Sequence, residues 1–401
     1  MNNLIYSRPF MYPKQEKAVF NDARFSVILG STKCGKTISC CIWLFEQAAM
    51  GKRNQIYWWL APSSDQASIA FREMKRIFPA NLFKVNETNK TLTLPNETVI
   101  KFKSAEILDN LYGEAVYGVV LDESSRCRPD VWAVIGSVTT VTKAKVRLIG
   151  NVVTRDWFYN LYLKHKDNPT SRYESHSITA WDAVEAGVVD QEEIEYKRQE
   201  LSDQMFKALY ENIPIATSSN PFGISHIIDA CTINGKPREL SQNEVVCFGV
   251  DIARSVDFTA VTGLDSFGSV AFFDRFQLGS WELTMNKILQ IVKNKPVTVD
   301  STGTGDAPFE LMAKGRSNFH PYNYTNDSKF KLMEKLAVGI QNGQIRFPGN
   351  SILQTELEAF EYKFENHRVK YYSPITDDCV NSLALAFEEF TKPQGDTIEF
   401  Y

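Results

Sequence analysis

The segment from Gly30 to Thr37 reads GSTKCGKT, which has the GxxxxGK[ST] spacing of a phosphate-binding loop. In such a loop, the backbone N–H groups and the dipole of the following helix surround phosphate oxygens. We expect Lys36 to reach the β- and γ-phosphates of ATP, and the Thr37 hydroxyl to bind Mg²⁺. The remaining residues of the predicted nucleotide cradle are Gly30, Ser31, Thr32, Lys33, Cys34 and Gly35.

Two adjacent acids, Asp122 and Glu123, follow the apolar run Val119-Val120-Leu121. A buried strand that ends in acids places them in the crevice where open α/β sheets bind ligands. We expect Asp122 to hold Mg²⁺, directly or through water, and Glu123 to polarise the attacking water as a general base. Such pairs are common by themselves, but this one follows the phosphate-binding loop by about 85 residues, which strengthens the prediction.

Two amide side chains are further candidates for the nucleotide site. Gln15 lies in Tyr12-Pro13-Lys14-Gln15, just before the first strand, and a Gln amide can pair with the N6 and N7 edge of adenine. A solvated N-terminal turn explains Gln15 equally well. Asn151 follows a strand beside the two acids, where it could sense the γ-phosphate or cap the next turn, as could Thr154.

The second half of the chain carries a set of aspartates at expected strand and helix ends: Asp251, Asp257, Asp300, Asp377 and Asp378. An acid at the end of a buried strand is costly unless its charge is compensated. Two divalent metals gripped by several carboxylates would compensate it and could cut a phosphodiester in line. All-oxygen ligands suit Mg²⁺ or Mn²⁺. The alternative is that these acids are helix caps and turn residues, as Asp377 before a helix could be.

Strands alternate with helices in the first half, which predicts a parallel sheet covered by helices. The predicted strands are 25–30, 55–60, 116–122 and 145–150, and the predicted helices are 36–50, 64–78 and 191–212. A stretch rich in Pro, Ser and Gly predicts a domain boundary within 213–243. The second half predicts a mixed sheet from strands at 245–253, 296–300 and two within 259–278, with helices at 282–293, 329–341, 353–362 and 377–390.

Charge is distributed unevenly along the 401 residues, although the net charge is only −4. Residues 1–169 carry 23 Lys and Arg against 15 Asp and Glu, a net of +8, and the rest of the chain is acidic. A basic front part could hold a phosphate backbone, although ordinary surface variation explains the pattern about as well.

The sequence predicts no membrane span and no signal peptide. Seven cysteines without a CxxC pair predict free thiols in a reducing cytoplasm.

These motifs resemble those of the large terminase subunits of tailed bacteriophages, over nearly the whole chain. Besides the Gln-containing segment, the phosphate-binding loop and the acid pair, the first half has three segments that match the family pattern: Trp59-Leu60-Ala61-Pro62 with Gln66-Ala67, Leu111-Tyr112-Gly113, and Ile149-Gly150-Asn151. The second half matches at Gly249-Val250-Asp251, at Val299-Asp300-Ser301-Thr302-Gly303, and at Asp377-Asp378 followed by Ser382-Leu383-Ala384-Leu385-Ala386.

The resemblance implies an α/β fold with an ASCE-type P-loop ATPase motor domain at 1–215, whose residues 170–215 form an acidic helical lid. A linker at 216–242 and an RNase H-like nuclease domain at 243–401 follow. It also implies a motor that packages double-stranded DNA into a procapsid and cuts it with Asp251, Asp300 and Asp378. The implied partners are a portal protein, a small terminase subunit and further copies in a pentameric ring, in the cytoplasm of an infected bacterium and outside the mature virion.

Two departures from the family pattern affect the expected chemistry. Thr32-Lys33 stands where the family often has an arginine that acts on the γ-phosphate, so the arginine finger is unassigned. Thr376 stands where a histidine often precedes the last acids. The competing interpretations are a helicase or repair translocase with an accessory nuclease, and a non-catalytic DNA-binding scaffold.

Overall fold

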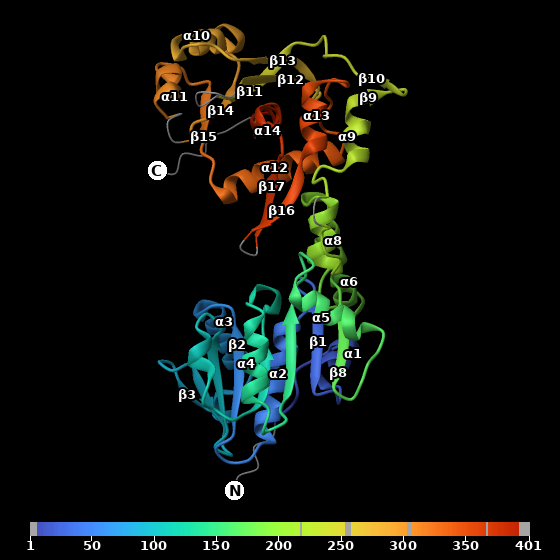
Figure 1. Cartoon of the computed structure of the whole chain (residues 1–401), viewed down its shortest axis with the longest axis vertical. Coiled ribbons are helices and arrows are strands. Elements are labelled where there is room, and N and C mark those ends of the chain that lie inside the picture. Colours follow the sequence, from blue (N-terminus) through green and yellow to red (C-terminus); the bar gives the residue numbers. More distant parts are fainter. Residues whose placement is uncertain (1–5, 217–218, 253–257, 303–305, 366–367, 393–401) are drawn as a thin grey trace. The chain divides into compact units, whose positions relative to one another are not determined.

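The computed structural model describes residues 6–216, 219–252, 258–302, 306–365 and 368–392 (Figure 1). The chain divides into two compact units, one made of residues 1–197 and 203–216, and the other of residues 198–202 and 217–401. We call them the first and the second unit. In the described part of the chain, no helix combines the length and the apolar character that a membrane crossing requires.

The first unit is built on an eight-stranded sheet in the order β3-β4-β5-β2-β6-β7-β1-β8. From β5 to β8 every neighbouring pair is parallel, whereas β3 and β4 are antiparallel. Parallel strands need helical crossovers, and these cover both faces of the sheet. The strands are β1 Phe25–Gly30, β2 Ile56–Ala61, β3 Lys84–Asn86, β4 Thr91–Thr93, β5 Val99–Ser104, β6 Val116–Leu121, β7 Lys145–Gly150 and β8 Tyr173–Ile178.

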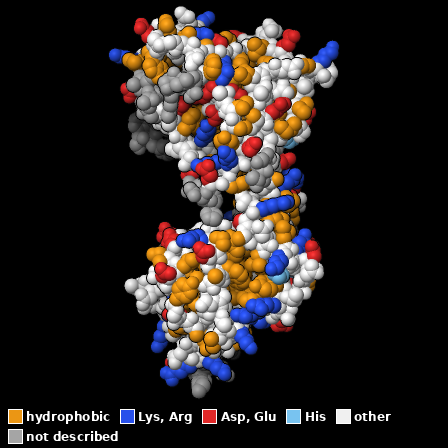
Figure 2. All heavy atoms as spheres, viewed as in Figure 1, with side chains coloured by type: hydrophobic (Ala, Val, Ile, Leu, Met, Phe, Trp, Pro, Cys, Tyr) orange, Lys and Arg blue, Asp and Glu red, His pale blue; other side chains and the backbone are white. Residues whose placement is uncertain are grey.

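Side-chain alternation along the central strands builds a separate core on each face of this sheet. Ile28 packs with the helices of one face, and Val27 and Leu29 with those of the other. One face carries α1 Pro13–Phe20, α2 Lys36–Ala49 and α3 Ser64–Ile77, and the other carries α4 Asp130–Val138 and α5 Trp157–Lys166. Figure 2 shows Lys and Arg side chains spread around a hydrophobic area on one side of this unit.

The predicted strands and helices around the nucleotide motifs match β1, α2, β2, α3, β6 and β7 to within two residues. The segment 170–215, predicted to be helical, differs in two ways. It supplies strand β8, which pairs with β1 at the edge of the sheet. Its long helix is divided into α7 Gln191–Glu200 and α8 Asp203–Glu211, after α6 Ala180–Glu185. Between α7 and α8, the backbone N–H of Ser202 bonds to the Glu334 carboxylate instead of a helical carbonyl.

The second unit is built on a five-stranded mixed sheet in the order β13-β12-β11-β14-β15. β11, β12 and β13 are antiparallel, and β14 and β15 run parallel to β11. The strands are β11 Val245–Asp251, β12 Thr259–Asp265, β13 Val270–Phe276, β14 Val297–Asp300 and β15 Phe319–Tyr322. Three antiparallel strands followed by two parallel ones form an RNase H-like sheet, as the resemblance implied.

Helices cover both faces of this second sheet. One core contains α9 Ile224–Cys231, α12 Asn326–Gln341, α13 Ile352–Ala359 and α14 Asp378–Phe390, and the other contains α10 Trp281–Val292 and α11 Asp306–Ala313. The chain also forms two hairpins, β9 Thr232–Ile233 with β10 Lys236–Pro237, and β16 Glu361–Glu365 with β17 Arg368–Tyr372. The expected linker 216–242 therefore contains α9 and a hairpin, because Ile227, Ala230 and Cys231 are buried in the core of this unit.

Candidate functional site

The phosphate-binding loop leaves the buried strand β1 and turns sharply into α2. The turn requires left-handed backbone at two positions, Lys33 with φ 65° and Gly35 with φ 78°. A side chain at position 35 would also approach within 2.3 Å of the Gln15 amide nitrogen, so only glycine fits. The backbone N–H groups of Ser31 and Thr32 donate to the carbonyls of Ile178 and Leu209, which fixes the start of the loop.

Most of the backbone N–H groups that follow Thr32 in the loop lack such carbonyl partners within the described structure. Among the described residues, the backbone N–H groups of Lys33, Gly35, Lys36 and Thr37 donate to no carbonyl. Four neighbouring N–H groups that donate to no backbone carbonyl, at the positive end of a helix, form a binding site for an anion such as a phosphate. The loop therefore fits the phosphates of a nucleotide.

Helix α1 is hydrogen-bonded to this loop through residues at its start. The Tyr12 hydroxyl and the Gln15 Nε2 both donate to the Cys34 carbonyl, at 2.7 and 2.9 Å, and Gln15 Oε1 accepts from the Tyr12 backbone. Gln15 is buried, which rules out the solvated turn that the sequence left open. The other end of α1 is anchored by Arg147 of β7, a fully buried guanidinium that donates to the carbonyls of Val19, Asn21 and Ala23.

The acid pair lies at the end of β6, the strand next to β7. Lys36 Nζ is 3.8 Å from the Glu123 carboxylate. Asp122 is buried and accepts from the Glu123 backbone N–H, and burial, together with the Glu123 charge, raises its pKa to about 7. Glu123 has a left-handed backbone with φ 46° and ψ 46°, a conformation that non-glycine residues adopt at a cost and that is concentrated at functional sites.

Asn151 follows β7 and reaches the loop from the other side. Its Nδ2 donates to the Thr32 hydroxyl at 3.0 Å, which links β7 to the loop residue that stands in the family's arginine position. Its Oδ1 is buried and has no hydrogen-bond partner among the described residues. Loop, acid pair and Asn151 therefore lie together at the carboxyl ends of β1, β6 and β7.

The second group of acids is gathered at the carboxyl ends of β11 and β14. These strands are parallel neighbours with Val250 beside Val299, so Asp251 and Asp300 extend from adjacent strand ends. Both side chains are buried. Burial raises the pKa of Asp251 well above its usual range, and the neighbouring Asp300, Asp377 and Asp378 raise it further, whereas a bond from Asn381 Nδ2 lowers it.

Helix α14 brings Asp377 and Asp378 to the same strand ends because it packs directly on β11. A Cβ atom on Gly249 would lie 2.1 Å from the Ala386 nitrogen and 2.2 Å from the Ser382 carbonyl. The absence of a side chain therefore lets strand and helix backbones touch. The hydroxyls of Thr262 and Ser382 are hydrogen-bonded across the same interface at 2.7 Å.

Each of these acids has a partner within the protein. Arg275 Nη2 lies 3.2 Å from Asp378, Lys329 Nζ lies 2.9 Å from Asp377, and Thr302 donates to Asp300. Within the described ranges, no three or more His, Cys, Asp or Glu side chains are placed so that they could hold a metal ion. The carboxylates are the kind of oxygen ligand that Mg²⁺ or Mn²⁺ prefers, but in this arrangement Arg275, Lys329 and Thr302 are bound to three of them. Asp257 lies outside the described residues.

Two residues that the sequence did not indicate support this acid group. Glu356 of α13 is completely buried and accepts from the backbone N–H groups of Cys379 and Val380 and from the Thr376 hydroxyl. It thereby caps α14 next to Asp377 and Asp378. The buried Tyr324 hydroxyl has no hydrogen-bond partner in the described structure, and its pKa is raised by burial and by the charges of Asp251, Asp300 and Asp377. Neither residue lies in a local motif, so no sequence signal identified them.

Several known proteins are similar to this chain over most of its length. The large terminase subunit of Thermus phage G20c is 23% identical over 393 residues, covering 85% of this chain and 80% of the relative, and that of Thermus virus P23-45 matches equally. A solved large terminase from a thermophilic bacteriophage has the same fold, with a TM-score of 0.58 and 14% identity, covering 93% of this chain and 97% of the other. The family model for the N-terminal part of T4likevirus-type terminase large subunits matches residues 27–227, about half of the chain. This chain therefore belongs to the terminase large subunit family.

Proposed function

We propose that this chain is the motor and nuclease of a phage DNA-packaging machine. It uses ATP hydrolysis to move double-stranded DNA into a procapsid and cuts the DNA at the start and end of packaging. One observation carries this proposal. A single chain of this family has both a phosphate-binding loop with an acid pair and a separate group of buried aspartates. The large terminase of the thermophilic bacteriophage with the same fold was also solved in complex with ATP-gamma-S.

In the first unit, the unpaired loop N–H groups bind the phosphates of ATP, and Lys36 neutralises their charge. Thr37 and Asp122 would hold Mg²⁺, which would stabilise the negative charge on the phosphate oxygens. Glu123 lies within 3.8 Å of Lys36, so the general base and the phosphate-binding cation face the same place. Asn151 connects this place to β7 through Thr32 and can report which nucleotide is bound.

In the second unit, Asp251, Asp300, Asp377 and Asp378 would hold Mg²⁺ or Mn²⁺, which would supply charge stabilisation for cutting a phosphodiester. Asn381 orients Asp251, and Thr302 orients Asp300. Arg275 and Lys329 form ion pairs with Asp378 and Asp377, so these carboxylates would have to exchange their partners to bind a cation.

The family also suggests partners for this activity. We propose that the chain assembles as a pentameric ring on a portal protein, receives DNA through a small terminase subunit, and works in the cytoplasm of the infected host. Co-sedimentation of the purified chain with portal-bearing procapsids, with and without ATP, tests the docking step.

Two variants test the two activities separately. Lys36→Ala should abolish ATP hydrolysis and leave metal-dependent nicking of a plasmid intact, whereas Asp300→Asn should do the reverse. Lys52→Ala and Asp274→Asn, which lie outside both sites, serve as charge-matched controls. Hydrolysis that survives in Lys36→Ala, or nicking that survives in Asp300→Asn, would show that the corresponding site is assigned wrongly. Strand separation without uptake of DNA into procapsids would instead favour a helicase.

A further inference from the structure

The second unit contains a basic cavity at the end of its sheet that lies opposite the aspartates. Val245 of β11 pairs with Asp265 of β12, and Asp251 pairs with Ala260, so the β12–β13 turn and Asp251 lie at opposite ends of the same strands. Seven residues of extended strand separate these ends by about 20 Å. The cavity beside this turn has a volume of about 530 Å³, which is within the range of small-ligand sites.

Three chain segments form the cavity, and backbone hydrogen bonds hold them together. The β9–β10 hairpin is fixed by bonds from the Arg238 N–H to the Cys231 carbonyl and from the Gly349 N–H to the Arg238 carbonyl. The segment at Arg346 is bound to the β12–β13 turn at Gly268 and Val270. The rim of the cavity therefore has a defined shape.

One buried acid, Asp265, fixes the β12–β13 turn and the strand leading to it. Its carboxylate accepts from the Ser241 hydroxyl, the Asn243 amide and the backbone N–H groups of Phe267 and Ser269. With these donors, the charge of Asp265 is satisfied within the protein. It therefore does not neutralise the basic residues that line the cavity.

Three cations line the cavity: Lys236, Arg238 and Arg346. None of them forms an ion pair with an acid in the described part of the chain. Arg346 donates one weak bond to the Phe267 carbonyl at 3.3 Å, and the Arg238 Nε is buried without an acceptor among the described residues. A buried donor without an acceptor is destabilising, so an acceptor from a ligand would stabilise this arrangement.

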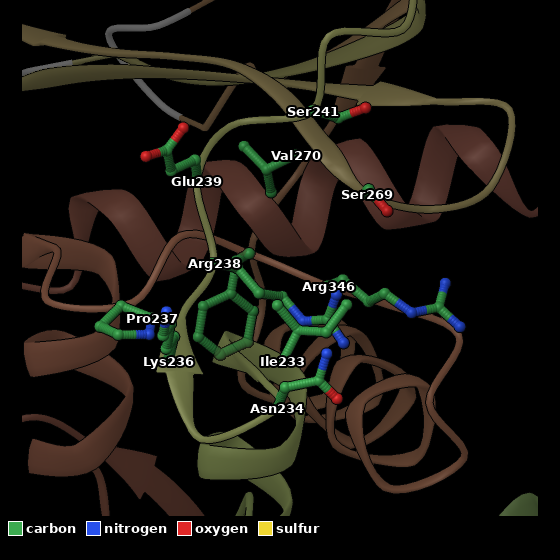
Figure 3. Close-up of a pocket in the computed structure, with 11 residues that line it drawn as sticks. Ile233, Asn234, Lys236, Pro237, Arg238, Glu239, Ser241, Ser269, Val270 and Arg346 are labelled. Atoms are coloured by element: carbon green, nitrogen blue, oxygen red, sulfur yellow. The ribbon is translucent and has the colours of Figure 1, made fainter.

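Figure 3 shows how these side chains lie in the cavity. The Arg238 side chain points into the space beside Ile233 and Asn234, and the Arg346 side chain extends to the right from the same region. Glu239, the acid among the lining residues, turns its carboxylate away from both arginines. The local charge near the guanidinium groups is therefore positive, and Asn234 and Ser269 add uncharged donors.

We propose that this cavity is a phosphate-binding subsite, separate from both the nucleotide loop and the aspartates. Guanidinium groups bind phosphate oxygens through paired N–H donors. The positive charge of three cations is more than one carboxylate of an acidic peptide would neutralise, which favours phosphate as the ligand. This assignment rests on the proposed function: the phosphate belongs to the backbone of DNA held by the second unit. Free phosphate is the other source of the same chemistry.

The test uses the full chain and hydrogen exchange measured by mass spectrometry, because this readout distinguishes the cavity from the nucleotide loop. The probes are inorganic phosphate and a short DNA duplex in EDTA, with poly-glutamate as a comparison, and the variant is Arg238→Gln with Arg346→Gln. Lys314→Gln, an exposed cation of the same unit, is the control. We expect both probes to protect residues 231–241 in the wild type and the control. In the double variant, the affinity of phosphate for this segment should fall at least about tenfold, and the salt slope of duplex binding should decrease by about 2.

Other results would separate the subsite, its DNA ligand and the proposed function from one another. Protection by phosphate but not by the duplex would refute the DNA assignment and leave free phosphate as the ligand. Protection by poly-glutamate but not by phosphate would identify a peptide site, and no protection, or equal protection in the double variant, would refute the subsite. If the wild type neither hydrolyses ATP nor nicks DNA while phosphate still protects the cavity, the proposed function fails and the subsite stands.

Discussion

At the scale of single residues, Gln15 makes contacts that its motif does not predict. The sequence left an adenine contact and a solvated turn open, and the structure shows both ends of the amide hydrogen-bonded inside the protein, one to the Cys34 carbonyl and one to the Tyr12 backbone. An amide held in this way sets the path of the phosphate-binding loop, which contacts every nucleotide alike. Gln15 is thus in place to act as a positioning residue for the loop.

Replacing Gln15 distinguishes loop positioning from base recognition. Gln15→Ala removes a buried hydrogen bond, so the affinities for ATP and GTP should fall together by about tenfold, which corresponds to about 1.4 kcal/mol. Tyr12→Phe removes the other donor to Cys34 and should act in the same direction. The measurement is fluorescence titration with labelled analogues of both nucleotides. A loss confined to ATP would instead establish Gln15 as a reader of adenine.

Glu356 provides a second test at this scale, because its carboxylate caps α14 beside Asp378. Glu356→Ala leaves two backbone N–H groups and the Thr376 hydroxyl without their buried acceptor, and should destabilise the second unit by about 2–4 kcal/mol. Glu356→Gln keeps one acceptor oxygen and should cost about half as much. Hydrogen exchange at the start of α14 reports the change, and equal exchange in all three proteins would exclude the capping role.

At the scale of elements, both candidate sites arise from the same arrangement, in which parallel strands end side by side. β1, β6 and β7 bring together the loop, the acid pair and Asn151, and β11 with β14 brings together Asp251 and Asp300. The second site also needs a helix that lies directly on a strand. That contact depends on Gly249, whose position leaves no space for a side chain.

Gly249→Ala should therefore separate α14 from β11. Its Cβ would overlap backbone atoms, which cannot move aside as a side chain could, so we expect a loss of about 3 kcal/mol or more. Metal-dependent nicking should fall with it, because Asp378 moves with α14. Gly279→Ala is the matched control, since its Cβ would meet nothing within 4 Å. Chemical denaturation followed by circular dichroism measures both variants, and similar stabilities would show that the contact tolerates a side chain.

At the scale of the whole molecule, the chain combines a basic front part with an acidic remainder. Residues 1–169 have a net charge of +8. We propose that duplex DNA contacts this front part through its phosphates, independently of base sequence. The expected signature is the release of counterions, which makes binding depend on salt.

Raising the salt concentration from 50 to 200 mM should weaken duplex binding by about 10³-fold if at least six phosphates are contacted. Fluorescence anisotropy with two duplexes of unrelated sequence measures this dependence, and both should give the same slope. ATP binding, measured in parallel, should change far less, because its contacts are confined to one loop. An affinity that hardly depends on salt would contradict backbone binding.

The sequence by itself determined the local features. The loop motif, the acid pair, the strands β1, β2, β6, β7, β11 and β14, and the helices α2, α3, α10, α12 and α14 depend on short-range periodicity and spacing, which can be recognised from one chain. The short strands β15, β16 and β17 were not predicted, because their pairing partners and their burial are set by distant segments.

Only the tertiary structure decided which residues support the two sites. Glu356 and Asp378 are 22 positions apart, and Arg147 reaches the end of α1 from more than 120 positions away. Such contacts depend on how helices and strands pack, which leaves no mark on local spacing. For the same reason, Gln15 became a support for the loop, the basic cavity formed from three separate segments, and the paired cations beside the aspartates were found only in the folded chain.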